Sequence, residues 1–108
     1  MASVTLNTHA IVDFVSFHKQ SAQIFGFPHF YGANMDAWID CLSYLTNGDG
    51  MSSFILQGSE QLAIHVPDFE AFSRRLPEVS VSLLECTSFV NRRYIEANTE
   101  PRLVLVLA

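Results

Sequence analysis

The run LVLVL at residues 103–107 restricts the possible folds of this chain more than any other feature of its sequence. A strand with one face in water alternates apolar and polar residues, but this run is apolar at each position. That pattern is typical of a strand buried on both faces, and such strands belong mainly to parallel sheets covered by helices. Because parallel strands need long crossover connections, the run predicts an α/β fold with helices elsewhere in the chain.

The longest helical pattern lies directly before this run, from Pro77 to Ala97. Its apolar residues recur every three or four positions: Val79, Leu83, Cys86, Val90, Tyr94 and Ala97. A proline suits the first turn of a helix, where its missing N–H has no partner to lose. The spacing therefore predicts a helix over 77–97, and Pro101 lies in the connection that follows it.

Two shorter helical patterns precede the long one. From Ala10 to Phe25 the apolar residues have roughly the spacing of an amphipathic helix. Gly26 is expected to end this helix in a left-handed conformation, with Pro28 just beyond it. A brief helix is also predicted over 67–75.

Three further segments are predicted to be extended: Ser3–Leu6, Met51–Leu56 and Leu62–Val66. In the last of them apolar residues alternate with polar neighbours, which fits a short strand or an extended crossing. The sequence has no internal repeat, low-complexity tract or linker, so residues 1–108 are predicted to form one domain. Strands separated by helices favour a small, largely parallel sheet.

The N-terminal sequence MASVTLN has no basic segment followed by an apolar one, so we expect no signal peptide and a soluble, cytoplasmic protein. The two cysteines, Cys41 and Cys86, do not form a C-x-x-C pair. Both are expected to be buried free thiols.

The sequence contains no recognisable catalytic or metal-binding pattern. Its four histidines are scattered, and it has neither a Gly-rich phosphate loop nor a G-x-S-x-G motif. We therefore expect no catalytic residue, no metal and no cofactor. A small hydrolase with Cys41 as its nucleophile is an alternative, but the helical pattern puts Cys41 among apolar side chains, where a thiol is normally inert.

The stretch FPHFYGANMDAWIDCL, residues 27–42, predicts a turn followed by a helix that begins after Asn34 and runs to about Leu45. Its apolar face is expected to comprise Met35, Trp38, Cys41, Leu42 and Leu45. The opposite face carries Asp36, Asp40 and Ser43, and the two borders between the faces carry Ile39 and Tyr44.

Asp36 and Asp40 are four residues apart on this helix, where like charges repel. The helix dipole favours an acid in the first turn, but the second turn gains little from it. No lysine or arginine occurs between Lys19 and Arg74, so we expect both aspartates to lack a basic neighbour within the chain. Another protein would then supply the missing counter-charges.

The surroundings of the pair favour the same interpretation. The net charge of −5 is concentrated in the window without basic residues, which makes nucleic acid and anionic membranes poor partners. Three aromatic residues flank the aspartates: Phe30, Tyr31 and Tyr44. Acidic and aromatic side chains together suggest a surface for a cationic protein. Solubility alone is the alternative explanation of the charge.

The stretch 27–42 resembles the signature of the barstar family. The matching residues, in the same order and spacing, are Pro28, Tyr31, Gly32, Asn34, Asp36, Ala37, Asp40, Cys41 and Leu42. The resemblance implies a barstar-like α/β fold, in which a small three-stranded parallel sheet packs against about four helices.

It also implies a function. Barstar-like proteins inhibit a small secreted ribonuclease and protect the cell that makes it. By resemblance, Asp40 would be the central acid at the place of an RNA phosphate, and Asp36 would pair with a second basic group. Asn34 and Gly32 would add loop contacts, and Phe30 would stack on the partner. The residues expected at the partner-binding surface are Phe30, Tyr31, Gly32, Asn34, Asp36, Ile39, Asp40, Ser43 and Tyr44. A further family glutamate has Glu96 as its candidate here.

The partner expected from the resemblance is a basic ribonuclease or another nuclease toxin, bound by a monomer that contacts neither nucleic acid nor membrane directly. The sequence departs from the family pattern at Trp38-Ile39, where the family's best-known member has Leu-Trp. This departure leaves open an alternative, an interaction module of the same fold with a partner that is not a nuclease.

Overall fold

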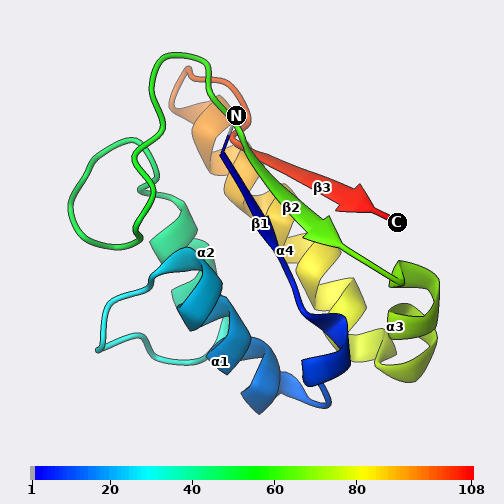
Figure 1. Ribbon diagram of the computed structural model, residues 1–108. Coiled ribbons are helices and arrows are strands. Elements are labelled where there is room, and N and C mark those ends of the chain that lie inside the picture. The colour runs from blue at the N-terminus through cyan, green and yellow to red at the C-terminus, as the bar shows by residue number, and fades with distance from the viewer. Residues whose placement is uncertain (1) are drawn as a thin grey trace.

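The computed structural model describes residues 2–108 and has an α/β fold (Figure 1). Its elements, in chain order, are β1 (Ala2–Thr5), the 3-10 turn η1 (Thr8–Ala10), α1 (Phe14–Phe25), α2 (Met35–Leu42), β2 (Leu62–Val66), α3 (Phe69–Arg75), α4 (Pro77–Glu96) and β3 (Leu103–Leu107). The strands form one parallel sheet in the order β1-β2-β3. The prediction of a small three-stranded parallel sheet with about four helices is confirmed.

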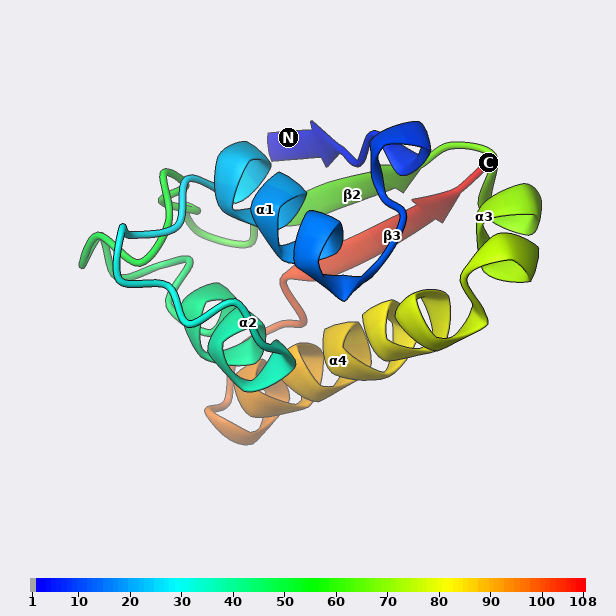
Figure 2. The ribbon, with the colours of Figure 1, turned by 90° about the horizontal axis from the view of Figure 1, so that it is seen from below.

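In the described part of the chain, α1, α2 and α4 pack on one face of the sheet, with α2 and α4 below it in Figure 2. Val4, Ile64 and Leu105 lie opposite one another on that face and contact the core. The next residue of each strand faces the other way, and of these Thr5 is exposed while His65 is half-buried. The protein therefore consists of two layers.

β3 lies at the edge of the sheet, and the prediction that both of its faces are buried is wrong. Leu103 is buried, but the next three residues are half-buried and Leu107 is 45% exposed. β2 is the strand that has neighbours on both sides, and four of its five residues are buried. The apolar run identified a strand correctly, but it did not indicate that the sheet would be small and covered on one face.

An asparagine of α4 bonds to the free edge of β3. The Oδ1 of Asn91 accepts the N–H of Leu103 at 2.9 Å, and its Nδ2 donates to the carbonyl of Leu103 at 3.0 Å. The amide side chain thus makes the two hydrogen bonds that a neighbouring strand would make at this position.

The strand predicted over 51–56 does not form. Two of its backbone N–H groups bond elsewhere instead: that of Ser53 donates to the carbonyl of Phe25, the last residue of α1, at 2.9 Å, and that of Leu56 donates to the carbonyl of Leu45, just after α2, at 2.7 Å. The segment is a loop that fastens the ends of α1 and α2 together.

The predicted helices are present with adjusted bounds. α1 begins at Phe14 rather than Ala10, because the Asp13 carboxylate accepts the N–H of Ser16 and the Ser16 hydroxyl in turn accepts the N–H of Asp13. Gly26 ends this helix in the left-handed conformation, as expected (φ 68°). The long helix α4 runs from Pro77 to Glu96, close to the predicted 77–97.

The core is formed largely by the sheet, α1, α2 and α4. Trp38 is fully buried and its ring packs against Phe17 and Phe25 of α1. Both cysteines are free, Cys41 buried and Cys86 half-buried. In the described part of the chain, no helix combines the length and apolar character required to cross a membrane.

Candidate partner-binding site

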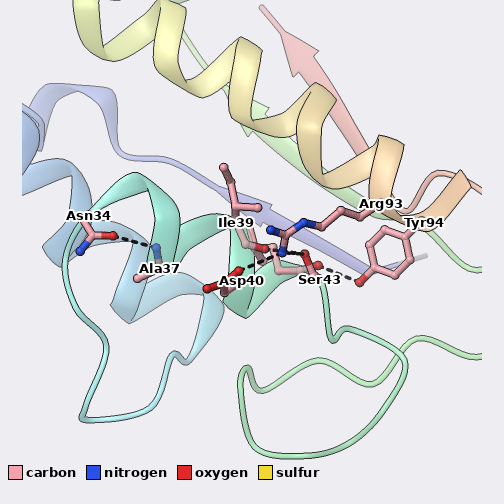
Figure 3. A network of polar contacts seen from close by, with 8 residues as sticks. Asn34, Ala37, Ile39, Asp40, Ser43, Arg93 and Tyr94 are labelled. Carbon is pink, nitrogen blue, oxygen red and sulfur yellow. Dashed lines mark hydrogen bonds and ion pairs between the residues drawn. The ribbon is translucent and has the colours of Figure 1, made fainter. Parts of the chain in front are cut away.

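Asn34 begins α2, as the sequence predicts. Its Oδ1 accepts the N–H of Ala37 at 2.8 Å, which satisfies one of the free amides of the first turn (Figure 3). Its Nδ2 also donates to the carbonyl of Gly32 at 3.3 Å. Ala33 between them has a φ of 53°, a conformation that is costly for a residue with a Cβ. The side chain of Asn34 thus helps to hold the loop in a conformation that Ala33 alone would disfavour.

The two faces of α2 are as predicted. Trp38, Cys41 and Leu42 point into the core, whereas Asp36 and Asp40 are exposed on the outer side. Ile39, predicted at the border between the faces, is only 8% exposed and belongs to the hydrophobic core. Burial raises the pKa of the Cys41 thiol, which favours its protonated form and weighs against a nucleophilic role.

Asp40 has a basic partner within the chain, and the prediction that it would have none is wrong. Nη1 of Arg93 donates to Oδ1 of Asp40 at 2.9 Å and contacts the Oγ of Ser43 at 3.3 Å (Figure 3). Arg93 belongs to α4, outside the window without basic residues. The prediction considered neighbours along the sequence, but α4 packs against α2 in the fold.

A hollow of about 340 Å³ lies between the two helices. Its lining residues are Asp36, Ile39, Asp40, Phe89 and Arg93. The guanidinium carbon of Arg93 lies 5.3 Å from the centre of the Phe89 ring, within the range of a cation–π contact. The hollow therefore combines two carboxylates, one guanidinium and two apolar side chains.

Phe89 and Arg93 are the contributions that the sequence did not predict. Glu96, the candidate for the family's further glutamate, does not line the hollow. The sequence pattern that could have indicated them is the apolar stripe of α4, which includes Val90 and Tyr94. Phe89 and Arg93 each precede one of these residues, so they lie near the border of the stripe. Finding them would have required knowing that α4 packs on α2.

Tyr94 connects the two helices beneath the site. Its hydroxyl donates to the carbonyl of Leu42 at 2.7 Å and accepts the N–H of Leu45 at 3.0 Å. These bonds satisfy backbone groups where α2 ends, three residues earlier than the predicted end at Leu45. Burial raises the pKa of Tyr94, which keeps its hydroxyl neutral and able to donate.

In the loop before α2, one aromatic side chain is exposed and the next one is half-buried. Phe30 is 67% exposed. Tyr31 is half-buried, its hydroxyl lies 2.6 Å from Nδ1 of His18, and its ring packs 4.6 Å from that of Phe27. Burial raises the pKa of Tyr31. The contacts of Tyr31 hold the loop against α1, and Phe30 beside it faces outward.

The remaining predicted residues lie around α2. Gly32 and Asn34 are exposed ahead of it, and Tyr44, which follows its last turn, is 42% exposed. Ser43 ends the helix, and its hydroxyl donates to the carbonyl of Ile39 at 2.7 Å. Of the nine predicted residues, Ile39 is buried and Tyr31 and Ser43 are half-buried, whereas the other six are exposed on α2 or in the segments next to it.

The site contains no arrangement suited to a metal. Among residues 2–108, no three side chains of histidine, cysteine, aspartate or glutamate converge closely enough to hold an ion. Its chemistry is that of charged, hydrogen-bonding and aromatic groups on an exposed helix.

A comparison with family models matches residues 1–106 to the model described as Barstar (barnase inhibitor). A comparison with curated proteins gives no match. The family match extends over nearly the whole chain, well beyond the motif at residues 27–42, and it agrees with the three-stranded parallel sheet and the four helices. This protein belongs to the barstar family.

Proposed function

We propose that this protein is an immunity-type ribonuclease inhibitor, which blocks the active site of a basic nuclease with Asp36, Asp40 and the loop before α2. The observation that carries the proposal is the exposure of both carboxylates on one face of a single helix. The description of the family as a barnase inhibitor supports it.

The chemistry of a ribonuclease site makes such a surface a suitable plug. A nuclease holds RNA phosphates with cationic side chains, so carboxylates at the same spacing compete for the same groups. Asp40 would take the central position, and Asp36 would pair with a second basic group. Phe30 would stack on the partner, while Gly32 and Asn34 would supply loop contacts. Tyr31, Ile39, Ser43 and Tyr44 would complete the surface.

The charge of the molecule supports a protein partner of opposite sign. A net charge of −5 repels nucleic acid and anionic membranes and attracts a basic protein. We therefore propose a monomer that acts in the cytoplasm against a basic ribonuclease or nuclease toxin, with neither an enzymatic activity nor a cofactor of its own.

Titration calorimetry against purified basic ribonucleases tests the proposal. Asp40→Asn and Asp36→Asn keep the size of the side chain but remove its charge, so each should weaken binding tenfold or more if it acts at the centre of the interface. Glu100→Gln, at an exposed position after α4, removes one negative charge outside the site and should change the affinity less than about twofold. Failure of basic ribonucleases to bind, or unchanged binding by Asp40→Asn, would contradict the proposal.

A second candidate is an interaction module with a partner that is not a nuclease. It is favoured by the guanidinium of Arg93 in the hollow, which makes this surface mixed in charge rather than purely acidic. Recovery of one specific protein without nuclease activity, whose binding is lost with Asp36→Asn, would support this candidate over the first.

A further inference from the structure

Arg93 makes the contacts that a cation from another protein would make at this site. Its guanidinium donates to Asp40 and Ser43 and lies over the ring of Phe89. Both members of the ion pair remain open to solvent, with the side chain of Arg93 43% exposed and that of Asp40 58% exposed. The contact is therefore reachable from outside and can be exchanged.

We propose that Arg93 is an internal competitor for Asp40. In the free protein the guanidinium of Arg93 is paired with the carboxylate of Asp40, and a cationic partner binds Asp40 by displacing this guanidinium. The inference rests on the proposed function, because it assumes that Asp40 binds a cation of the partner. It adds a residue that opposes binding and thereby selects among partners.

The displacement is feasible because the pair is weak. An ion pair between solvent-exposed side chains contributes little to stability, since water and salt screen it and two long side chains must be ordered. A partner that places several cations around Asp40 excludes water and strengthens its own contacts. A partner with a single exposed lysine gains little from the exchange.

After it leaves Asp40, the guanidinium of Arg93 can stay in contact with the ring of Phe89. Its carbon is 5.3 Å from the centre of the Phe89 ring, and the Phe89 ring is itself 47% exposed. Arg93 is therefore able to leave Asp40 and keep its contact with Phe89. A partner that places only cations near Phe89 would be repelled by the released Arg93.

This arrangement predicts selectivity through an opposing element. A partner is accepted if it outcompetes Arg93 at Asp40 and tolerates a guanidinium beside the interface. Asp36 lines the same hollow and has no ion pair among the described residues, so it is available to a partner without any exchange.

Two neighbouring arginines provide a matched pair of variants. Arg93→Gln and Arg92→Gln each remove one positive charge from the same turn of α4, so they change the overall charge of the molecule equally. Arg92 is exposed, does not line the hollow, and has no ion pair within residues 2–108. A difference between these variants therefore reports on the contact with Asp40 rather than on general attraction.

The first arm of the test uses a basic ribonuclease that binds the wild-type protein and loses affinity with Asp40→Asn, so that the proposed function already holds. Arg93→Gln should then bind this nuclease at least about threefold more tightly than Arg92→Gln. The Nε–H signal of Arg93 in nuclear magnetic resonance spectra should also shift when the nuclease is added. Equal affinities of the two variants, or weaker binding by Arg93→Gln, would overturn the inference while leaving the proposed function intact.

The second arm applies if no ribonuclease binds, and its probe is an octa-arginine peptide at low salt. Arg93→Gln should bind this peptide at least about threefold more tightly than Arg92→Gln, and the gain should disappear when Asp40→Asn is added. A gain that persists without Asp40, or no gain, would overturn the inference. Thermal unfolding of each variant confirms that both remain folded.

Discussion

At the scale of single residues, Asn34 is the residue whose effect on the fold is simplest to isolate. Replacing Asn34 with alanine removes the acceptor for the N–H of Ala37 and should lower the free energy of unfolding by about 1 kcal/mol. Asn34→Asp keeps the acceptor oxygen and adds a charge that the helix start favours, but it loses the Nδ2 donor to the carbonyl of Gly32, so it should lose less stability than Asn34→Ala. Urea unfolding measures both variants, and equal losses for both would mean that the cap bond does not stabilise α2.

The buried His18 should make the free energy of unfolding depend on pH. It is 4% exposed, and burial lowers its pKa below the ordinary value of about 6.5. The unfolded chain therefore binds a proton at a pH where the folded protein leaves His18 neutral. The associated stability is fully present above the unfolded pKa and is lost as the pH falls through it toward the folded pKa.

The test of this dependence is urea unfolding between pH 7.5 and pH 5. The wild type should lose more stability over this range than His18→Asn, which keeps a polar atom near the position of Nδ1 but does not titrate. Other titrating groups affect both proteins alike, so the difference between the two curves isolates His18. Parallel curves would show that His18 is not responsible.

The residues that could be predicted from the sequence are those whose environment is local. Asn34 and Trp38 were placed correctly because a cap and a helix face depend on neighbours within a few positions. The pairing of Arg93 with Asp40 was not predictable in this way, because these residues are far apart along the chain and meet only where α4 packs on α2.

At the scale of elements, the end of α2 depends on a hydroxyl from α4. Tyr94→Phe leaves the N–H of Leu45 and the carbonyl of Leu42 without this partner in a buried place. The loss should be about 1–3 kcal/mol in the free energy of unfolding.

Tyr44 supplies the control for this prediction, since its side chain is exposed after α2. Tyr44→Phe removes an equivalent hydroxyl and should change stability by less than about 0.5 kcal/mol. Chemical denaturation of the two variants decides the matter, and a Tyr94→Phe protein as stable as Tyr44→Phe would contradict the role given to the buried hydroxyl.

Helices were predictable here and strands less so, for a physical reason. The bounds of a helix follow from caps and from a repeat within one segment, as at Pro77 and Gly26. A strand requires a partner elsewhere in the chain. Residues 51–56 have a sequence suited to a strand, but Ser53 and Leu56 donate their backbone N–H groups to the carbonyls of Phe25 and Leu45, at the end of α1 and just after α2. The edge position of β3 likewise depends on the number of strands, which its own sequence does not contain.

At the scale of the whole molecule, acidic charge should determine how fast a partner arrives. If the partner is basic, the association rate constant should fall at least about tenfold when the salt concentration rises from 50 to 500 mM, because screening shortens the range of the attraction. The dissociation rate constant should change much less. Stopped-flow measurements check both, and an association rate insensitive to salt would mean that the net charge of −5 does not steer binding.

Two of the arginines hold separate segments of the fold together. Arg75 donates to the carbonyls of Ile11 and Thr8, at 2.7 and 2.8 Å, and so joins the end of α3 to the turn after β1. Arg102 is 7% exposed and donates to the carbonyl of Gly58 at 2.7 Å. A count of charges along the sequence did not reveal these bonds, because they connect segments that meet only in the folded protein.

The parallel sheet also sets an order of events during folding. β2 pairs with β1 and with β3, and in both cases the paired strands are far apart in sequence, since Ala2 lies opposite Leu62 and Leu62 lies opposite Leu103. Helices assemble from neighbouring residues within about a microsecond, whereas distant strand pairing is slow. α2 is an early element by this reasoning, but its last turn waits for the hydroxyl of Tyr94. A newly made chain would therefore complete the last turn of α2, which carries Asp40, only after α4 has docked.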